Sequence, residues 1–122
     1  MKNIKSALLI DDSNIDNFIN HKMLESHGVT NVISFNNALS ALSYLKEAHI
    51  KYDLILIDIY MPINDGFSFI DKFYELELHK TQGQICILTV SLNPLDKAKA
   101  AEKNIKFIEK PFTIEKLLNK TK

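Results

Sequence analysis

Short, uninterrupted runs of apolar residues alternate along this chain with longer segments in which apolar residues recur every three or four positions. The clearest runs are residues 7–10 and 54–57, and runs that each include one polar residue cover 32–35, 85–89 and 105–108. Runs of this length, bounded by turn-forming residues, are typical of strands buried on both faces of a parallel sheet. The pattern therefore predicts five buried strands.

Each strand is followed by a segment with helical periodicity, so five amphipathic helices are predicted. Ser13 with Asp16 three residues later is a helix-start pattern, Thr113 is expected to cap the last helix, and Gly28 is placed to end the first. The residues expected to face the core are Ile15, Phe18, Ile19 and Met23 in the first helix, Ala38, Leu42, Leu45 and Ala48 in the second, Phe67, Ile70, Phe73 and Leu76 in the third, Leu95, Ala98 and Ala101 in the fourth, and Ile114, Leu117 and Leu118 in the fifth.

Strict alternation of strands and helices is the pattern of an α/β protein. It predicts a five-stranded parallel sheet, doubly wound, with right-handed crossovers and helices on both faces. The length of 122 residues suits one domain, and no linker or internal repeat interrupts it. We therefore expect a single domain over residues 1–122, with no output domain.

Charge and composition narrow the choice of partners. The formal net charge is zero and the fifteen basic residues are all lysine, which gives no basic excess for direct nucleic-acid binding. The one cysteine, Cys86, lies in an apolar run, so we expect a buried thiol and a reducing compartment. No segment has the length of a signal peptide's apolar region or a membrane span, so we expect a cytoplasmic protein without membrane insertion.

Polar residues gather at the carboxyl ends of the predicted strands. Asp11 and Asp12 follow the first strand, Asp58 follows the third, Thr89 ends the fourth, and Lys110 comes just after the fifth. Carboxyl ends of parallel strands lie along one edge of the sheet, where open α/β proteins bind their ligands. These residues are therefore expected to meet in one cleft.

Three carboxylates in one cleft repel each other. At about 5 Å each pair costs on the order of 3 kcal/mol at an effective dielectric constant near 20. A Mg²⁺ ion suits such a site, and with Lys110 it would balance the three negative charges. A neutral site of this kind can admit a phosphoryl group that one carboxylate oxygen attacks in line, with Thr89 donating a hydrogen bond to the product.

Four motifs in this order resemble the receiver domain of bacterial two-component response regulators, the group that includes the chemotaxis receivers. They are residues 9–13 (LIDDS), 58–66 (DIYMPINDG), 88–89 (LT) and 110–112 (KPF). The resemblance covers the whole chain. It implies a flavodoxin-like sheet with the strand order 2-1-3-4-5.

The resemblance also implies roles for the acidic residues. Asp58 would be the phosphoacceptor. Asp12 would bind Mg²⁺ directly, Asp11 would do so directly or through water, and the backbone carbonyl of Tyr60 would be a further ligand.

Further roles follow from the resemblance for residues near the last two strands. Thr89 would be the switch hydroxyl that moves toward the phosphoryl group, and Lys110 would pair with the phosphoryl oxygens. The Lys110–Pro111 peptide bond would be cis. Phe107 occupies the aromatic switch position on the fifth strand, although an inward core phenylalanine explains it equally well.

The implied function is a phosphorylation-dependent switch. A histidine kinase or a histidine phosphotransfer protein would donate to Asp58, and the face made by the fourth helix, fifth strand and fifth helix would contact a downstream protein. Relay of the phosphoryl group to another histidine is an equal alternative. The only reactions expected of the chain are its own phosphoryl transfer and autodephosphorylation, so it is not expected to be an enzyme.

The chain departs from the family pattern in one respect. Val90 follows Thr89 where many relatives have alanine or another small residue, so access to Asp58 is expected to be narrower. Tyr60 and Ser91, two places after Asp58 and Thr89, are positions that tune phosphoryl lifetime in the family.

Other functions remain open on the sequence. The acidic pair could be a strand exit and helix cap, and Thr89 could simply end a strand. A small Mg²⁺-dependent phosphatase or phosphotransferase would use the same carboxylates, but Tyr60 stands where haloacid-dehalogenase-like enzymes have a second aspartate. An interaction module that is not phosphorylated is the third possibility, and retention of Asp58 and Lys110 argues against it.

Overall fold

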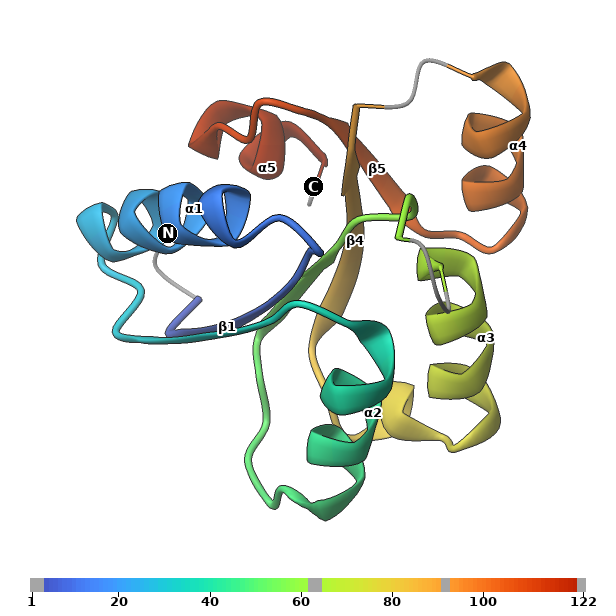
Figure 1. The fold of residues 1–122 in the computed structure, drawn as a ribbon, viewed down its shortest axis with the longest axis horizontal. Helices are drawn as coiled ribbons and strands as arrows, with labels where there is room; N and C mark the ends of the chain where they lie inside the picture. The colour runs from blue at the N-terminus through green and yellow to red at the C-terminus, as the bar shows by residue number, and fades with distance from the viewer. Residues whose placement is uncertain (1–3, 62–64, 91–92, 121–122) are drawn as a thin grey trace.

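The computed structural model describes residues 4–61, 65–90 and 93–120, and it contains the predicted sheet (Figure 1). Five parallel strands lie in the order β2-β1-β3-β4-β5, which confirms both the fold class and the strand order that the resemblance implies. The strands are β1 (Ser6–Ile10), β2 (Asn31–Phe35), β3 (Leu54–Ile57), β4 (Gln84–Thr89) and β5 (Lys106–Glu109).

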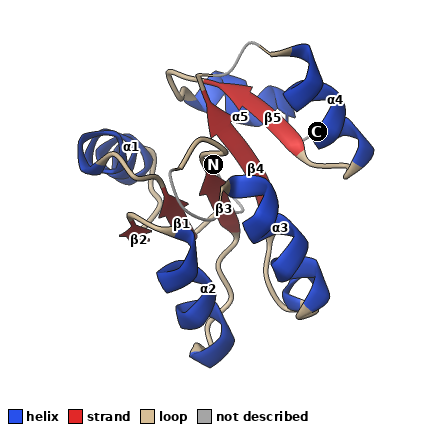
Figure 2. Cartoon of the chain, turned by 45° about the vertical axis from the view of Figure 1, so that its right-hand side comes forward, coloured by secondary structure: helices blue, strands red, loops and turns tan. Residues whose placement is uncertain are grey.

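Helices cover both faces of the sheet, as Figures 1 and 2 show. One face carries α1 (Asn14–Ser26) and α5 (Ile114–Lys120), and the other carries α2 (Ala38–Glu47), α3 (Gly66–Glu75) and α4 (Pro94–Glu102). A short 3₁₀ helix, η1 (Leu78–Lys80), was not predicted and follows α3. Among the described residues, no helix is both long and apolar enough to cross a membrane.

The central strand shows why its apolar run has no polar break. Leu54 and Leu56 belong to the core beneath α1 and α5, whereas Ile55 and Ile57 belong to the core beneath α2, α3 and α4. Successive side chains of a strand point to opposite faces, so a strand covered on both sides needs an apolar residue at every position. Cys86 in β4 is buried in the same way, as predicted.

The predicted inner face of α1 is wrong except at Met23, which is partly buried against the core. Ile15, Phe18 and Ile19 are 72%, 63% and 50% exposed, whereas the buried residues of the helix are Asn17, Asn20 and Leu24. Asn17 is buried because its side-chain amide donates hydrogen bonds to the carbonyl oxygens of Asp11 and Phe35. Those two bonds offset the cost of burying a polar side chain, and they rotate the apolar stripe of the helix toward solvent.

The predicted inner face of α4 is also wrong. Leu95, Ala98 and Ala101 are exposed, and Ala100 is the helix's one buried residue. Alanines at neighbouring positions of a short helix give no apolar stripe that singles out one face. Leu76 and Leu118, at the ends of α3 and α5, are exposed as well, while the remaining expected core residues of α2, α3 and α5 are buried, with Ala48 partly so.

The predicted helix ends are largely confirmed. The Ser13 side chain accepts a hydrogen bond from the Asp16 backbone N–H, and Thr113 does the same for Lys116. After α1 the chain reaches Gly28 with φ of 91°, in the left-handed region that glycine adopts without strain. Residues 62–64 of the 58–66 motif lie outside the described residues.

Candidate phosphoryl-transfer site

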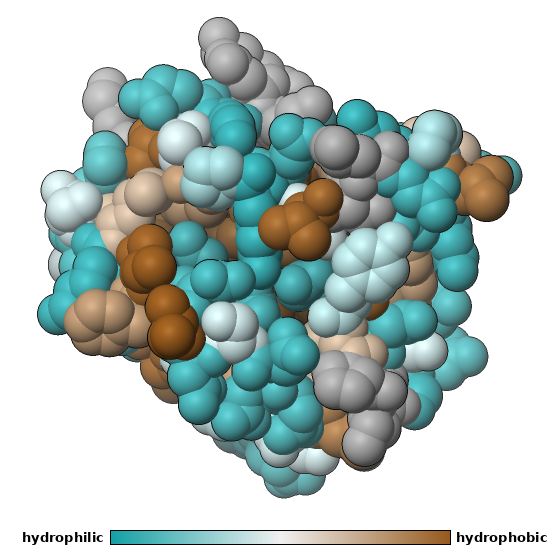
Figure 3. Space-filling model, turned by 45° about the horizontal axis from the view of Figure 1, so that its top comes forward, coloured by the Kyte–Doolittle hydropathy of each residue, from teal (hydrophilic) through white to brown (hydrophobic). Residues whose placement is uncertain are grey.

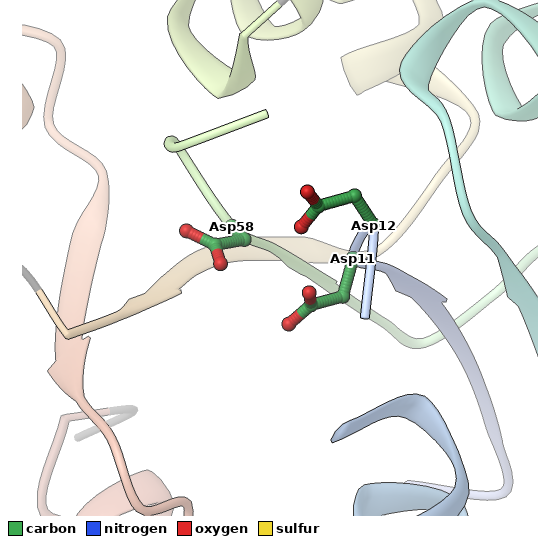
Figure 4. Close-up of side chains that lie close together, drawn as sticks. All are labelled: Asp11, Asp12 and Asp58. Atoms are coloured by element: carbon green, nitrogen blue, oxygen red, sulfur yellow. The ribbon is translucent and has the colours of Figure 1, made fainter. Parts of the chain in front are cut away.

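Three carboxylates meet where β1 and β3 end side by side. Asp11, Asp12 and Asp58 each offer one oxygen, and these oxygens all lie within 4.8 Å of one another (Figure 4). Asp11 and Asp58 are buried and Asp12 is exposed. The sheet sets this geometry, because the Asp58 backbone N–H donates to the carbonyl of Ile10 in the adjacent strand at 3.0 Å. The predicted convergence of these residues is thus present.

Local backbone groups orient the two buried carboxylates. Asp11 Oδ1 accepts a hydrogen bond from the Ser13 backbone N–H at 2.9 Å, and Asp58 Oδ1 accepts one from the Tyr60 backbone N–H at 3.0 Å. Gly66 lies against the Asp58 backbone, because a Cβ atom at this position would lie 2.7 Å from the Asp58 carbonyl oxygen. Glycine is therefore required where α3 begins beside the phosphoacceptor candidate.

Lys110 directly follows the carboxyl end of β5, and its side chain reaches the carboxylates. Its Nζ lies 2.7 Å from Asp11 Oδ2 and 3.1 Å from Asp58 Oδ2. Its backbone N–H donates to the carbonyl of Thr89 at 2.8 Å, which aligns the ends of β4 and β5. The Lys110–Pro111 bond is cis, as the resemblance implies.

Burial and charge act against each other at this site. Burial raises the pKa of Asp11 above its ordinary value even though Lys110 and the Ser13 N–H lower it. For Lys110, burial alone would lower the pKa, but hydrogen bonds to Asp11 and Asp16 and the charge of Asp58 outweigh burial and raise it. The lysine therefore stays charged, while the carboxylates carry more negative charge than one ammonium balances.

The donor set fits a hard divalent cation. All three clustered groups are carboxylates, and carboxylate oxygens together with water are the ligands that Mg²⁺ prefers. A cation here would relieve the repulsion that remains after Lys110 is counted. Asp65, a further acidic residue of the 58–66 motif, caps α3 by accepting a hydrogen bond from the Ser68 backbone N–H.

Sequence reasoning missed one acidic residue of the site. Asp16 Oδ2 lies 2.7 Å from Lys110 Nζ, as close as Asp11 does. Asp16 was interpreted as part of a helix-start pattern, and it does occupy that position in α1. Its second role depends on a lysine 94 residues away, for which the local pattern holds no information.

The remaining predicted residues lie on β4, on β5 and after β3. Thr89 is the last residue of β4 and is fully buried, and Phe107 in β5 is half-buried with Lys97 Nζ 5.9 Å from its ring centre. The Tyr60 side chain is half-exposed, and its hydroxyl donates to Asp96 at the start of α4 at 2.6 Å. Ser91 lies outside the described residues.

A pocket of about 340 Å³ opens beside Lys110. Val90 forms part of its wall and is 65% exposed. The lining residues are Asp16, Ile19, Asn20, Met23, Val90, Lys110, Pro111 and Phe112. The pocket is therefore a depression between α1 and the segment that follows β5.

Comparisons with known proteins find similarity to two-component signalling proteins. Residues 7–122 match the response regulator receiver domain family. Two-component response regulator 24 of Arabidopsis thaliana is 32% identical over 93% of this chain and 79% of its own length. Sensor histidine kinase CheAY of Helicobacter pylori is 32% identical over 91% of this chain but only 14% of its own length. A two-component response regulator from Cytophaga hutchinsonii superposes with a TM-score of 0.84 at 34% identity, covering 97% of this chain and 94% of that one.

These likenesses extend over nearly the whole chain and include the elements that carry the carboxylates and the lysine. Receiver domains take part in two-component phosphorelay signalling with histidine kinases or phosphotransfer proteins, and they bind Mg²⁺ at an acidic pocket. The chain belongs to the response regulator receiver domain family.

Proposed function

We propose that this chain is a phosphorylation-dependent switch in which Asp58 accepts a phosphoryl group from a phosphohistidine. The observation that carries the proposal is the placement of the Lys110 ammonium 3.1 Å from Asp58 Oδ2, next to the Asp11 and Asp12 carboxylates. An ammonium beside a carboxylate that is to be phosphorylated can stabilise the phosphoryl oxygens as negative charge develops on them.

In the proposed reaction an Asp58 carboxylate oxygen attacks phosphorus. The O–P bond forms as the N–P bond of the phosphoimidazole breaks, and the electron pair returns to the imidazole nitrogen, which takes up a proton. The Tyr60 N–H holds Asp58 Oδ1, so the carboxylate is already oriented before the donor arrives.

Asp11, Asp12, Asp58 and the Tyr60 carbonyl would hold Mg²⁺, which when bound supplies positive charge for the phosphoryl oxygens. Lys110 supplies the other positive charge, and its raised pKa keeps it protonated throughout the physiological range. The proposed role of Thr89 is to donate its hydroxyl hydrogen bond to the new phosphoryl group.

We propose that the response is transmitted across the α4-β5-α5 face to a downstream protein, or that the phosphoryl group is passed onward to another histidine. Thr89 lies in β4 and the half-buried Phe107 lies in β5, and these two strands are paired. Phe107 pairs with Ile87, and Thr89 pairs with Glu109. A shift of Thr89 would therefore act directly on the strand that carries Phe107.

The donor is proposed to approach over α1. Figure 3 shows separate hydrophobic side chains on a mainly hydrophilic surface. Ile15, Phe18 and Ile19 of α1 are exposed, and Ile19 also lines the pocket beside Lys110. A protein that brings a phosphohistidine to Asp58 would cover these apolar side chains, which explains why they face solvent in the free chain.

Labelling with a small phosphodonor tests the proposal. Acetyl phosphate with Mg²⁺ is expected to add one phosphoryl group to the wild-type chain and none to Asp58→Asn, as read by intact mass. Labelling of Asp58→Asn, or no labelling of the wild type, would contradict the proposal. Repeated turnover of a phosphate ester would instead favour a phosphatase.

The donor surface has a separate test. Phe18→Ser is expected to slow transfer from a phosphorylated histidine phosphotransfer protein by about tenfold, because truncating an aromatic interface anchor commonly removes 1–2 kcal/mol. Labelling by acetyl phosphate should be unchanged. Leu95→Ser is the matched control, since Leu95 is an apolar residue of α4 that is at least as exposed as Phe18. Equal slowing by both substitutions would refute docking on α1.

A further inference from the structure

We propose that Asp16 is a positioning residue that holds the Lys110 ammonium at the outer side of the acidic site and thereby sets, in opposite directions, the affinity for the cation and for the phosphoryl group. This inference rests on the proposed function. It concerns a residue outside the motifs that identify the family. The observation is the ion pair between Asp16 Oδ2 and Lys110 Nζ at 2.7 Å.

The lysine has three N–H donors and three carboxylate partners. Nζ lies 2.7 Å from Asp11 Oδ2, 2.7 Å from Asp16 Oδ2 and 3.1 Å from Asp58 Oδ2. The contact to the proposed phosphoacceptor is thus the longest of the three. A phosphoryl group on Asp58 would need at least one donor that the resting site directs elsewhere.

The three partners differ in how readily they release the lysine. The side chains of Asp11 and Asp58 are 6% and 8% exposed, whereas the Asp16 side chain is 38% exposed. Breaking an ion pair with a solvated carboxylate costs little, but leaving a buried carboxylate unpaired costs much more. Asp16 is therefore the partner that Lys110 can leave when a phosphoryl group arrives.

Asp16 is held firmly enough to act in this way. Its backbone N–H donates to Ser13 Oγ, and the Ser13 backbone N–H donates to Asp11 Oδ1. The next residue, Asn17, ties the same turn of α1 to the carbonyl oxygens of Asp11 and Phe35. The backbone of this turn is thus fixed to the ends of β1 and β2, and Asp16 lines the same pocket as Lys110.

The charge of Asp16 has two opposite consequences. It adds negative charge near the Asp11, Asp12 and Asp58 cluster, and it draws Lys110 outward, so both effects favour a bound cation. The same two effects oppose an incoming anion, because the field is more negative and the ammonium is already engaged. Loss of a structural contact would weaken both ligands, so the opposed signs distinguish the two roles.

The test measures both affinities by NMR titration of backbone amides. Mg²⁺ is titrated alone, and beryllofluoride, a stable mimic of a phosphoryl group, is then titrated at saturating Mg²⁺. Asp16→Asn is expected to weaken Mg²⁺ binding by about threefold to tenfold and to strengthen beryllofluoride binding by a similar factor, as removal of one nearby partly solvated charge implies. Asp16→Glu keeps the charge and should stay within about twofold of the wild type.

Glu25→Gln is the matched control. It removes one negative charge from the same helix, nine residues away, or about 13 Å along the helix axis, where Glu25 pairs with His21 and Lys22. It should leave both affinities unchanged. Any pattern for Asp16→Asn other than weaker Mg²⁺ with stronger beryllofluoride overturns the inference. If wild-type protein itself binds no beryllofluoride, the proposed function fails instead.

Discussion

The two helices that flank the site are attached to the sheet in different ways. The first turn of α1 is held by buried hydrogen bonds from Asn17 to two backbone carbonyls and by the ion pair of Asp16 with Lys110. The helix also buries Leu24 in the core. Detaching α1 would break these contacts and expose apolar core around Leu24 to water, which is costly.

By contrast, Ala100 is the only buried residue of α4, and polar or charged side chains make several of its other contacts. Asp96 accepts from the Tyr60 hydroxyl, the ammonium of Lys99 lies 4.5 Å from the centre of the Phe67 ring, and Lys103, which follows the helix, pairs with Asp71. Exposed electrostatic contacts contribute roughly 0–1 kcal/mol each. The contacts of α1 thus hold Lys110 at the site. Detaching α4 from the sheet is expected to cost less free energy than detaching α1. We therefore expect α4 to be the helix that moves on phosphorylation.

The largest expected effect comes from removing the lysine that links α1 to the site. Lys110→Met should slow acyl-phosphate formation from acetyl phosphate by about 10²-fold or more, the usual loss on removing one charge-stabilising donor. Lys116→Met is the control, because Lys116 Nζ contacts only the backbone carbonyls of Glu109 and Pro111 among its described partners. A rate for Lys110→Met within tenfold of the wild type would contradict the proposal that Lys110 stabilises the phosphoryl oxygens.

The next effect compares one asparagine from each helix. Asn17→Ala should lower the free energy of unfolding by about 2–3 kcal/mol, because it breaks one buried and one partly buried hydrogen bond and removes a donor from the buried contact to the Asp11 carbonyl. Asn93→Ala removes the cap of α4, where the side chain accepts from the Leu95 N–H, and should cost about 1 kcal/mol. Urea denaturation measures both, and equal losses would contradict the contrast between the helices.

A smaller effect is expected from the hydroxyl that joins Tyr60 to α4. Tyr60→Phe should change global stability by no more than about 1 kcal/mol, yet raise hydrogen exchange of α4 amides by up to about fivefold, because the bond is exposed and local. Exchange in α1 should not change. Tyr74→Phe, on α3, is the control, and unaltered exchange in α4 would show that this contact does not hold the helix.

The smallest expected effect is the rate at which a thiol reagent modifies Cys86, which lies in the core beneath α1 and α5. Burial raises the pKa of the fully buried Cys86 thiol to about 12. At pH 8 only about one thiol in ten thousand would then be ionised in the folded chain, so a thiol reagent should react at the rate of global unfolding. Faster reaction of Cys86 would mean that α1 or α5 opens independently. That result would contradict the conclusion that α1 is attached to the sheet more firmly than α4.

Much of the fold could be predicted because its causes are local. A strand covered on both faces has to be apolar at every position, so residues 7–10 and 54–57 indicated β1 and β3 directly. Carboxylates at the ends of two such strands had to share an edge, and Asp11 and Asp58 do. The prediction failed for the inner faces of α1 and α4. In α1 the buried face includes Asn17, which has hydrogen-bond partners beneath it, and in α4 only Ala100 is buried, so neither buried face follows the apolar stripe.

The sequence by itself determined the order of strands and helices, the edge of the sheet that carries the chemistry, and the residue types available there. Only the tertiary structure decided that Asn17 is buried while Phe18 is exposed, and that Asp16 shares Lys110 with Asp11 and Asp58. The physical reason is that apolar periodicity is a property of neighbouring residues. A hydrogen bond or an ion pair depends on a partner that folding brings in, here from the ends of β2 and β5.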